Sequence, residues 1–316
     1  MRFSIGIPAF KARFLYDCIA SVLGQTYTDF ELIIVNDASP EDVEGVVNNF
    51  SDKRIRYYVN EKNYGAENVV DNWNKCLSYA LGDYFVLMGD DDLMMPNYLY
   101  EFSKLIDRYP NVNVFHCRTK EIDENSNFRT IHQNLPEWES VFDLMLNRLA
   151  RNRVTFISDF VYKTKHLRNN GGFYKLPLAW ASDDITSYIA AKDNGIIHTN
   201  ECLFCYRRHS RSITSSGSVL KKLEAIVLEK EWYFQFLSEC EARGTTEQEV
   251  KNVLISLLNQ CISKRQALAI GLITKGPKLR MFLSLVVKRT KLGLSIKTLI
   301  YSIFISIKYK LNGRPI

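Results

Sequence analysis

Between residues 3 and 117, short apolar runs rich in Val, Ile, Phe and Tyr alternate with helix-like stretches, and this alternation constrains the fold most. Parallel strands need long crossover connections, so this order predicts an α/β fold whose mostly parallel sheet has helices on both faces. The runs expected to form strands are 3–8, 31–37, 54–60, 83–89 and 111–117, and helical spacing occurs near 13–24, 40–49, 65–80 and 96–109.

Polar residues follow several of these strands. Ligands of such sheets bind at the carboxyl ends of the strands, where the sequence places Pro8, Asn36, Asp37 and the run Asp90 to Asp92. Three adjacent carboxylates repel one another in a low-dielectric pocket, so we expect a proton on one of them or a cation among them. A solvated turn or a helix N-terminus is the alternative, because aspartate is favoured at both.

The aspartate run also indicates how a phosphate ligand is held. Neither GxGxxG nor GxxxxGK[ST] follows an expected strand, which disfavours a dinucleotide-binding or P-loop enzyme. A divalent cation held by carboxylates is another way to bind a diphosphate, because Mg²⁺ and Mn²⁺ prefer oxygen ligands.

The formal net charge of +6 is distributed unevenly. Residues 250–316 hold thirteen Lys or Arg and no Asp or Glu, whereas residues 1–249 hold 28 basic and 35 acidic residues. Two regions with different tasks are implied. The basic residues of the second region are interleaved with Ile, Leu and Val, so we expect no nucleic-acid partner.

The first residues and the cysteines indicate in which cellular compartment the protein is expected. Only a five-residue, mostly apolar stretch precedes Pro8, which is too short for the core of a secretory signal. Seven cysteines without a repeated spacing predict reduced core thiols rather than a disulfide framework. We therefore expect a cytoplasmic protein.

Five segments in order, SIGIPAF, ELIIVNDAS, GDYFVLMGDDDLMMP, GGF and a later acidic pair, resemble the family 2 glycosyltransferases with the GT-A fold over roughly residues 3–214. The resemblance implies a catalytic domain at 1–217, with a nucleotide-sugar half at about 1–110 and an acceptor half at about 111–217. It also implies an inverting, metal-assisted transfer in surface polysaccharide synthesis. The donor would be a nucleotide-diphosphate sugar, with uridine expected, and the acceptor a glycan or a lipid-linked saccharide.

The resemblance assigns roles to residues of the donor site. Asp91 would be the principal ligand of Mn²⁺ or Mg²⁺, with Asp92 and His209 as further metal ligands. The residues that would hold the nucleotide, ribose and phosphates are Pro8, Ala9, Phe10, Asn36, Asp37, Asn74, Asp90, Arg207 and Arg208. The chain departs from the family pattern at Lys11, where Asn is usual, and at Trp73, where Arg often precedes Asn74.

The reaction also requires a base and an acceptor site. By the resemblance Asp184 is the base and Asp183 positions it or the acceptor, although capping of the expected helix by these residues is the alternative. Gly172, Phe173 and Trp180 would contact the acceptor, with core packing as the alternative for Phe173. Displacement from the face opposite the diphosphate predicts inversion.

Residues 218–316 lie outside the resemblance and are expected to be helical, with two amphipathic helices separated near Gly244. In residues 295–308 the apolar stripe is Ile296, Ile300, Ile303 and Ile307, while Ser295, Thr298, Ser302 and Ser306 lie on another side. We expect 275–316 to contact the inner face of the cell membrane peripherally. The alternative is burial against the body or a dimer partner, and the sequence leaves the oligomeric state open.

Two other functions stay open from the sequence. A sugar-phosphate nucleotidyltransferase of related fold needs a glycine-rich loop after its first strand, which GIPAFKAR does not supply. A catalytically silent nucleotide-sugar-binding protein or membrane scaffold would keep donor binding without turnover.

Overall fold

The computed structural model describes residues 2–209, 218–273 and 279–312. The chain forms two compact units, one of residues 1–175 with 182–215 and the other of 176–181 with 216–316. The last eight residues of the expected catalytic domain, 210–217, lie outside the described residues, as do 275–278 and 313–316 of the expected membrane-contacting segment.

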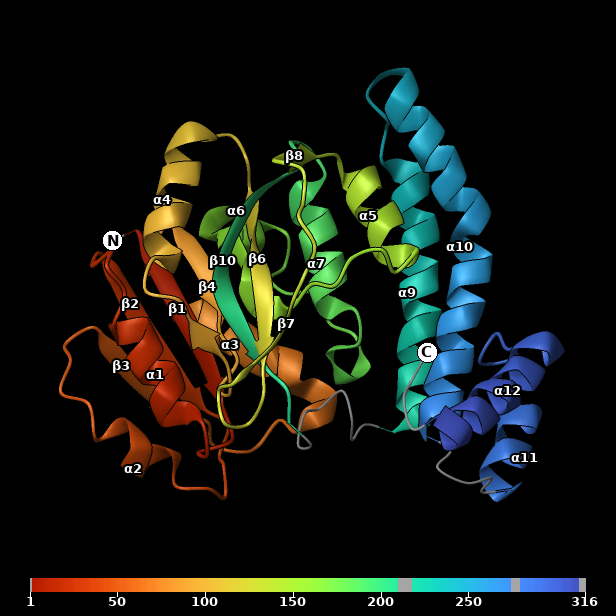
Figure 1. Ribbon diagram of the computed structural model, residues 1–316, viewed down its shortest axis with the longest axis horizontal. Helices are drawn as coiled ribbons and strands as arrows, with labels where there is room; N and C mark the ends of the chain where they lie inside the picture. Colours follow the sequence, from red (N-terminus) through yellow and green to blue (C-terminus); the bar gives the residue numbers. More distant parts are fainter. Residues whose placement is uncertain (1, 210–217, 274–278, 313–316) are drawn as a thin grey trace. The chain divides into compact units, whose positions relative to one another are not determined.

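Within the described residues, ten strands form one sheet in the first unit (Figure 1). Eight of them follow the path β3-β2-β1-β4-β9-β6-β10-β5, while β7 pairs with β6 and β8 pairs with β10. Five strands match the expected runs: β1 (Phe3–Ala9), β2 (Phe30–Asn36), β3 (Ile55–Val59), β4 (Tyr84–Leu87) and β6 (Val114–Ile122). The first four of these pair in parallel, as expected for a sheet covered on both faces. The remaining strands are β5 (Leu93–Met94), β7 (Phe128–Ile131), β8 (Trp138–Glu139), β9 (Phe160–Lys163) and β10 (Ile196–Arg207).

One strand breaks the parallel order. The sequence order alone would bring β6 next to β4, but β9 lies between them and is antiparallel to both. Strand β10 then pairs in parallel with β6 on its other side. The predicted α/β class with a mostly parallel sheet is confirmed, and β9 is the antiparallel insertion that the sequence pattern missed.

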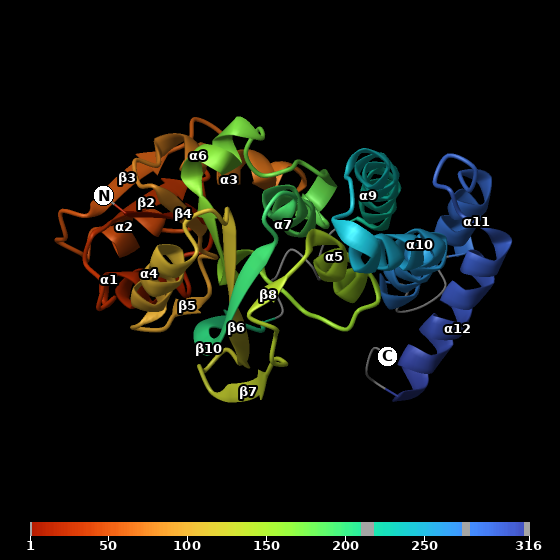
Figure 2. The same cartoon turned by 90° about the horizontal axis from the view of Figure 1, so that it is seen from above.

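Helices cover both faces of this sheet. In the view from above, α1 (Leu15–Leu23) and α4 (Tyr98–Arg108) lie on one face, and α3 (Val69–Tyr79), α6 (Thr164–Asn169) and α7 (Ser182–Ala191) lie on the other (Figure 2). Strands β1, β2 and β4 between them are mostly apolar and buried along most of their length, because both faces exclude water. The shorter elements are α2 (Val43–Val47), α5 (Val141–Leu149), and the 3₁₀ turns η1 (Ala66–Asn68) and η2 (Ile157–Asp159).

The second unit is helical, as expected. It contains η3 (Pro177–Ala179), α9 (Val219–Glu239), α10 (Gly244–Ile273), α11 (Leu279–Val287) and α12 (Ile296–Asn312). Gly271 of α10 lets α12 pack closely, since a Cβ atom there would lie 2.7 Å from Ile305 Cγ2. Across the described helices, none has both the length and the apolar character of a membrane span.

Candidate active site

The carboxyl ends of β1, β2 and β4 meet at one edge of the sheet. Ala9 pairs in register with Asn36, and the backbone N–H groups of Phe10 and Lys11 each donate to Asp90 Oδ2 at 2.8 Å. The chain after β1 is thereby fixed to the first residue of the aspartate run. Folding therefore gathers at one edge the predicted nucleotide-binding residues that are 80 positions apart in sequence.

The turn after β2 is rigidly held. Asn36 Nδ2 donates to the Tyr57 hydroxyl at 2.9 Å, and Asp37 Oδ1 accepts from Asn60 Nδ2 at 2.9 Å and from the Tyr64 N–H at 3.1 Å. Both Asn36 and Asp37 are buried, whereas the Phe10 side chain is 39% exposed. Phe10 thus leaves part of its aromatic side chain open to solvent, and the contact of these residues with a nucleotide stays a prediction.

Cationic groups surround the aspartate run, as electrostatics required. Lys11 Nζ lies 2.6 Å from Asp91 Oδ2 and 3.7 Å from Asp90 Oδ1. His209 Nε2 contacts the same Asp91 oxygen at 2.7 Å, and the backbone N–H of Arg207 donates to Asp92 Oδ1 at 2.8 Å. A lysine of the chain itself therefore supplies positive charge among the three carboxylates, and the divalent metal stays a prediction.

The three carboxyl groups have different proton affinities. Burial, with the charge of Asp91 adding to it, raises the pKa of Asp90 to about 6 and the pKa of Asp92 well above its ordinary value. Burial acts in the same direction on Asp91, but hydrogen bonds and charges from His209 and Lys11 outweigh it and lower its pKa. The run therefore holds less than three full negative charges near neutral pH.

The acidic pair opens α7, and its two members have different surroundings. Asp184 is buried, and both its oxygens accept from Arg148 of α5, Oδ1 from Nε at 2.7 Å and Oδ2 from Nη2 at 2.9 Å. Asp183 is only partly buried. Burial and the charge of Asp184 raise the pKa of Asp183 to about 7. One carboxylate is thus held in an ion pair, and its neighbour has the pKa of a base that works near pH 7.

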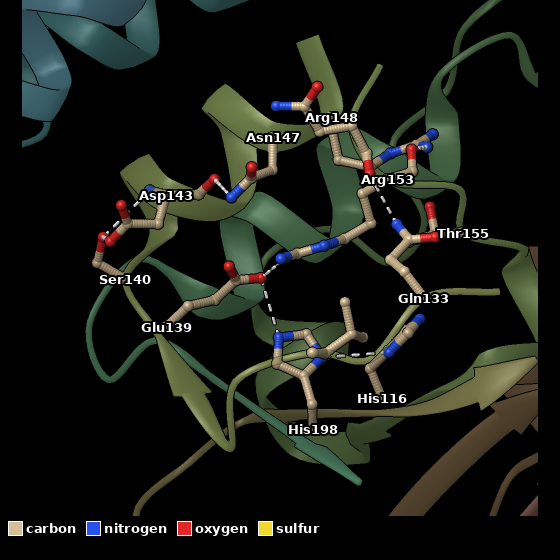
Figure 3. Close-up of polar contacts among 12 residues, drawn as sticks. His116, Gln133, Glu139, Ser140, Asp143, Asn147, Arg148, Arg153, Thr155 and His198 are labelled. Carbon is tan, nitrogen blue, oxygen red and sulfur yellow. Dashed lines mark hydrogen bonds and ion pairs between the residues drawn. The ribbon is translucent and has the colours of Figure 1, made fainter. Parts of the chain in front are cut away.

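A buried polar network holds Arg148 in place (Figure 3). Arg148 Nη1 donates to the Arg153 carbonyl oxygen at 2.7 Å, and the Arg153 side chain pairs with Glu139. Glu139 Oε1 also contacts His198 Nε2 at 2.9 Å. Burial lowers the pKa of His198 to about 4, so this imidazole is neutral near pH 7. The network orients the guanidinium that pairs with Asp184.

Residues 155–158 connect the two acidic groups, and the sequence carried no motif that marked them. Thr155 Oγ1 lies 3.5 Å from Asp184 Oδ1, and Ser158 Oγ accepts the N–H of Gly89 at 3.0 Å. Three residues span at most about 11 Å between Cα atoms. Because Gly89 directly precedes the aspartate run, this segment keeps the acidic pair close to the sheet edge.

Comparison with known proteins identifies the family of the chain. The family model described as Glycosyl transferase family 2 matches residues 4–166, which is more than half of the chain. The chain belongs to this family. It is a glycosyltransferase, which removes the nucleotidyltransferase and silent-scaffold alternatives.

Two similar glycosyltransferases agree with that membership. The chain is 25% identical over 267 residues to Glycosyltransferase GlyG of Streptococcus pneumoniae, covering 81% of this chain and 86% of the relative. It is 27% identical over 217 residues to the UDP-Glc:alpha-D-GlcNAc-diphosphoundecaprenol beta-1,3-glucosyltransferase WfgD of Escherichia coli, covering 67% and 79%.

Two solved structures share the fold. One is S. aureus TarS 1–349 in complex with UDP-GlcNAc, with a TM-score of 0.66, 15% identity and coverage of 99% of this chain and 93% of the other. The second is the mannosyltransferase PcManGT of Pyrobaculum calidifontis in complex with GDP-Man and Mn²⁺, with a TM-score of 0.58, 14% identity and coverage of 99% and 88%. The predicted GT-A fold is confirmed.

The aspartate run of this family 2 enzyme does not fit a divalent cation as folded. Lys11 and His209 share the Asp91 oxygen, and backbone N–H groups already donate to Asp90 and Asp92. Among the described residues, no group of three or more His, Cys, Asp or Glu side chains is arranged to hold a metal ion. A metal at Asp91 would first have to displace the ammonium of Lys11, so the metal-ligand roles of Asp91, Asp92 and His209 stay predictions.

The two arginines predicted to bind phosphate have different partners. Arg208 Nη2 donates to Glu121 Oε1 at 2.9 Å, so its charge is already paired. Arg207 is 1% exposed, and its Nε donates to the Asp91 carbonyl oxygen at 2.7 Å. Its Nη2 is buried without a hydrogen-bond partner in the described part of the chain, although Asp17 Oδ2 lies 4.0 Å away. Arg207 is therefore the better placed of the two to gain a phosphate contact.

The residues expected at the acceptor site are only partly brought together. Phe173 is 1% exposed, and its main-chain N–H and carbonyl both hydrogen-bond to the Asn74 amide, at 2.8 and 3.1 Å. Phe173 is thus a core residue, the alternative left open by the sequence, and Asn74 anchors the turn that contains Gly172. Trp180 belongs to the second unit, where Lys222 Nζ lies 4.9 Å from its ring centroid. The acceptor roles of these residues and the donor role of Asn74 stay predictions.

Proposed function

We propose that this glycosyltransferase moves a sugar from a uridine-diphosphate donor to a hydroxyl group of a lipid-linked saccharide, with inversion, in surface polysaccharide synthesis. The observation that carries the proposal is the shared sheet edge, where the ends of β1, β2 and β4 meet a cation-paired aspartate run. The names of two similar proteins support the substrates, since TarS holds UDP-GlcNAc and WfgD uses UDP-Glc with a diphosphoundecaprenol-linked sugar.

In this proposal Asp183, rather than Asp184, accepts the proton of the acceptor hydroxyl. Asp184 would have to give up a two-point contact with Arg148 to take a proton, and that costs more than protonating a carboxylate without such a partner. The pKa of about 7 matches Asp183 to the task near neutral pH. Asp184, paired with Arg148, then positions the start of α7. The base and positioning roles expected from the sequence for Asp184 and Asp183 are therefore exchanged.

The bond changes require no enzyme nucleophile. The acceptor oxygen attacks the anomeric carbon from the face opposite the diphosphate, and the bond from that carbon to the donor phosphate oxygen breaks with its electron pair. The hydroxyl proton passes to Asp183. Because one displacement occurs, the anomeric configuration inverts, and cationic side chains at the sheet edge stabilise the charge on the departing diphosphate.

A direct assay tests this proposal. The full-length protein is incubated with UDP-Glc, UDP-GlcNAc, UDP-Gal or GDP-mannose and with GlcNAc-diphosphoundecaprenol, and products are followed by nucleoside-diphosphate release and mass spectrometry. We expect transfer from at least one donor, and a β-linked product from the α-linked donor by the anomeric coupling constant in NMR. Transfer from GDP-mannose alone would contradict the choice of uridine, and an α-linked product would contradict inversion.

We further propose that α12 rests on an anionic membrane surface. Its polar residues Thr298 and Ser302 are buried at 3% and 2% exposure, whereas Ile300 is 62% and Phe304 is 57% exposed. A helix that turns its apolar side outward needs a cover, and the basic residues nearby favour anionic lipid by about 1 kcal/mol each near the surface. The apolar stripe expected from the sequence is on this outward side, with Ile296, Ile303 and Ile307 all at least 45% exposed.

Vesicle flotation tests this surface. The full-length protein is expected to float with phosphatidylglycerol vesicles, and the Ile300→Ser, Phe304→Ser variant to stay in solution. Leu81→Ser is the matched control, because Leu81 is also well exposed but lies in the first unit. If the variant floats as the parent does, the membrane role of α12 is wrong. A concentration-dependent dimer that the same variant abolishes would assign the surface to a second copy instead.

A further inference from the structure

Lys11 lies just after β1, and its side chain is mostly buried beside the aspartate run. It directly follows the exposed Phe10 at the end of β1, yet its own side chain is only 19% exposed and extends into the aspartate run. Its backbone N–H and its ammonium contact two different members of that run, Asp90 Oδ2 at 2.8 Å and Asp91 Oδ2 at 2.6 Å. The residue is therefore fixed at both ends of its side chain.

The ammonium retains hydrogen-bonding capacity in this position. It has three N–H donors, and Asp91 Oδ2 is its one hydrogen-bond acceptor within the described residues. The Asp90 carboxylate oxygen at 3.7 Å supplies charge but is beyond hydrogen-bond distance. Up to two N–H donors can thus contact an additional anion without breaking the pair with Asp91.

A second donor lies beside the same carboxylates. Arg207 binds the main chain of Asp91 through Nε and is almost completely buried, yet its Nη2 has no hydrogen-bond partner in the part of the chain that the structure describes. A buried guanidinium N–H without an acceptor is costly, and an anionic ligand at this edge would satisfy it. Two fixed cations, rather than one metal ion, are therefore arranged around the aspartate run.

We propose that Lys11, assisted by Arg207, is the cation that binds the donor's diphosphate, so that donor binding by this protein requires no divalent metal. The inference rests on the proposed function, because it presupposes a nucleotide-diphosphate donor. A lysine ammonium binds phosphate as a compact point charge, and at this site it takes the place between Asp90 and Asp91 that a metal ion would need. Asp91 then serves to hold Lys11 in position.

Calorimetric titration of UDP tests this inference. The full-length wild-type protein is titrated once after metal removal with EDTA and once with 5 mM Mn²⁺, about a saturating concentration for a weak carboxylate site. We expect the two dissociation constants to agree within about threefold. Binding of UDP with Mn²⁺ but not with EDTA overturns the role of Lys11 and leaves the proposed function standing. Absence of binding in both conditions overturns the uridine-diphosphate donor itself.

Two variants sharpen the result. Lys11→Asn and Lys11→Met are expected to weaken metal-free UDP binding at least tenfold, while Lys165→Met, an exposed lysine of α6, is expected to leave it unchanged. Thermal unfolding checks that each variant is folded. Folded Lys11 variants that bind metal-free UDP as tightly as the wild type contradict the proposal, and the wild-type comparison remains decisive if a variant does not fold.

Discussion

The aspartate run at 90–92 and the acidic pair at 183–184 are both clusters of adjacent carboxylates, but the fold neutralises them differently. Around the run, the carboxylates contact Lys11, His209 and several backbone N–H groups. In the pair, Arg148 contacts only Asp184, and the neighbouring carboxylate keeps a pKa of about 7. In this protein the groups that contact a carboxylate, more than the residue type, decide whether it serves as anchor, counter-ion or base.

The largest expected effect is a loss of turnover that tests which member of the acidic pair, Asp183 or Asp184, is the base. Asp183→Asn should lower turnover by roughly 10²–10⁴-fold, because the variant cannot accept the acceptor's proton, while UDP binding stays within about twofold. Steady-state kinetics and calorimetry measure the two quantities. Asp193→Asn, at an exposed turn just after α7, is the matched control and should retain full turnover. Near-normal turnover in Asp183→Asn would return the base role to Asp184.

The next effect is on stability, and it tests whether the buried Asp184 carboxylate depends on Arg148 as its partner. Arg148→Met leaves the buried Asp184 carboxylate without its partner, so the free energy of unfolding should fall by about 3–5 kcal/mol in urea titrations. The double variant Arg148→Met, Asp184→Leu should recover much of that loss, since no buried charge remains. Equal stability of the single variant and the wild type would mean that the ion pair does not hold α7 in place.

The smallest effect is the pH dependence that follows from the raised pKa of Asp183. A base must be deprotonated to act, so kcat/KM should rise with pH, level off above about 7 and fall about tenfold for each unit below it. The residual activity of Asp183→Asn should lack this limb. A wild-type profile that is flat from pH 5 to 8 would show that Asp183 does not titrate in the reaction.

Local sequence was sufficient for five strands of the sheet. The runs that became β1, β2, β3, β4 and β6 are apolar and bounded by turn residues, so the strand positions followed from pattern. Strand β9 was missed because FVYK is only four residues long, and its place between β4 and β6 is set by pairings with residues far away in the chain. Residues 155–158 were missed for the same reason, since their role lies in two long-range hydrogen bonds.

The C-terminal helix α12 shows the same limit of sequence pattern, here for which side of a helix is buried. The sequence indicated two stripes on 295–308, one of isoleucines and one of small hydroxyl residues, but a pattern cannot tell which stripe is covered. In the structure the buried side includes Ser302 and Ile305, next to Gly271 of α10. Ile305, which is not part of the isoleucine stripe, is therefore the apolar contact of the covered side.

From the sequence alone came the α/β class, the positions of the strand ends and the need for a positive charge among three aspartates, because periodicity and Coulomb repulsion act over a few residues. Only the tertiary structure decided that this charge is Lys11, 80 positions before Asp91, and that Arg148, 36 positions before Asp184, takes one member of the acidic pair. Such partners are chosen by strand register and helix packing, which bring distant residues within hydrogen-bond distance and leave no trace in local pattern.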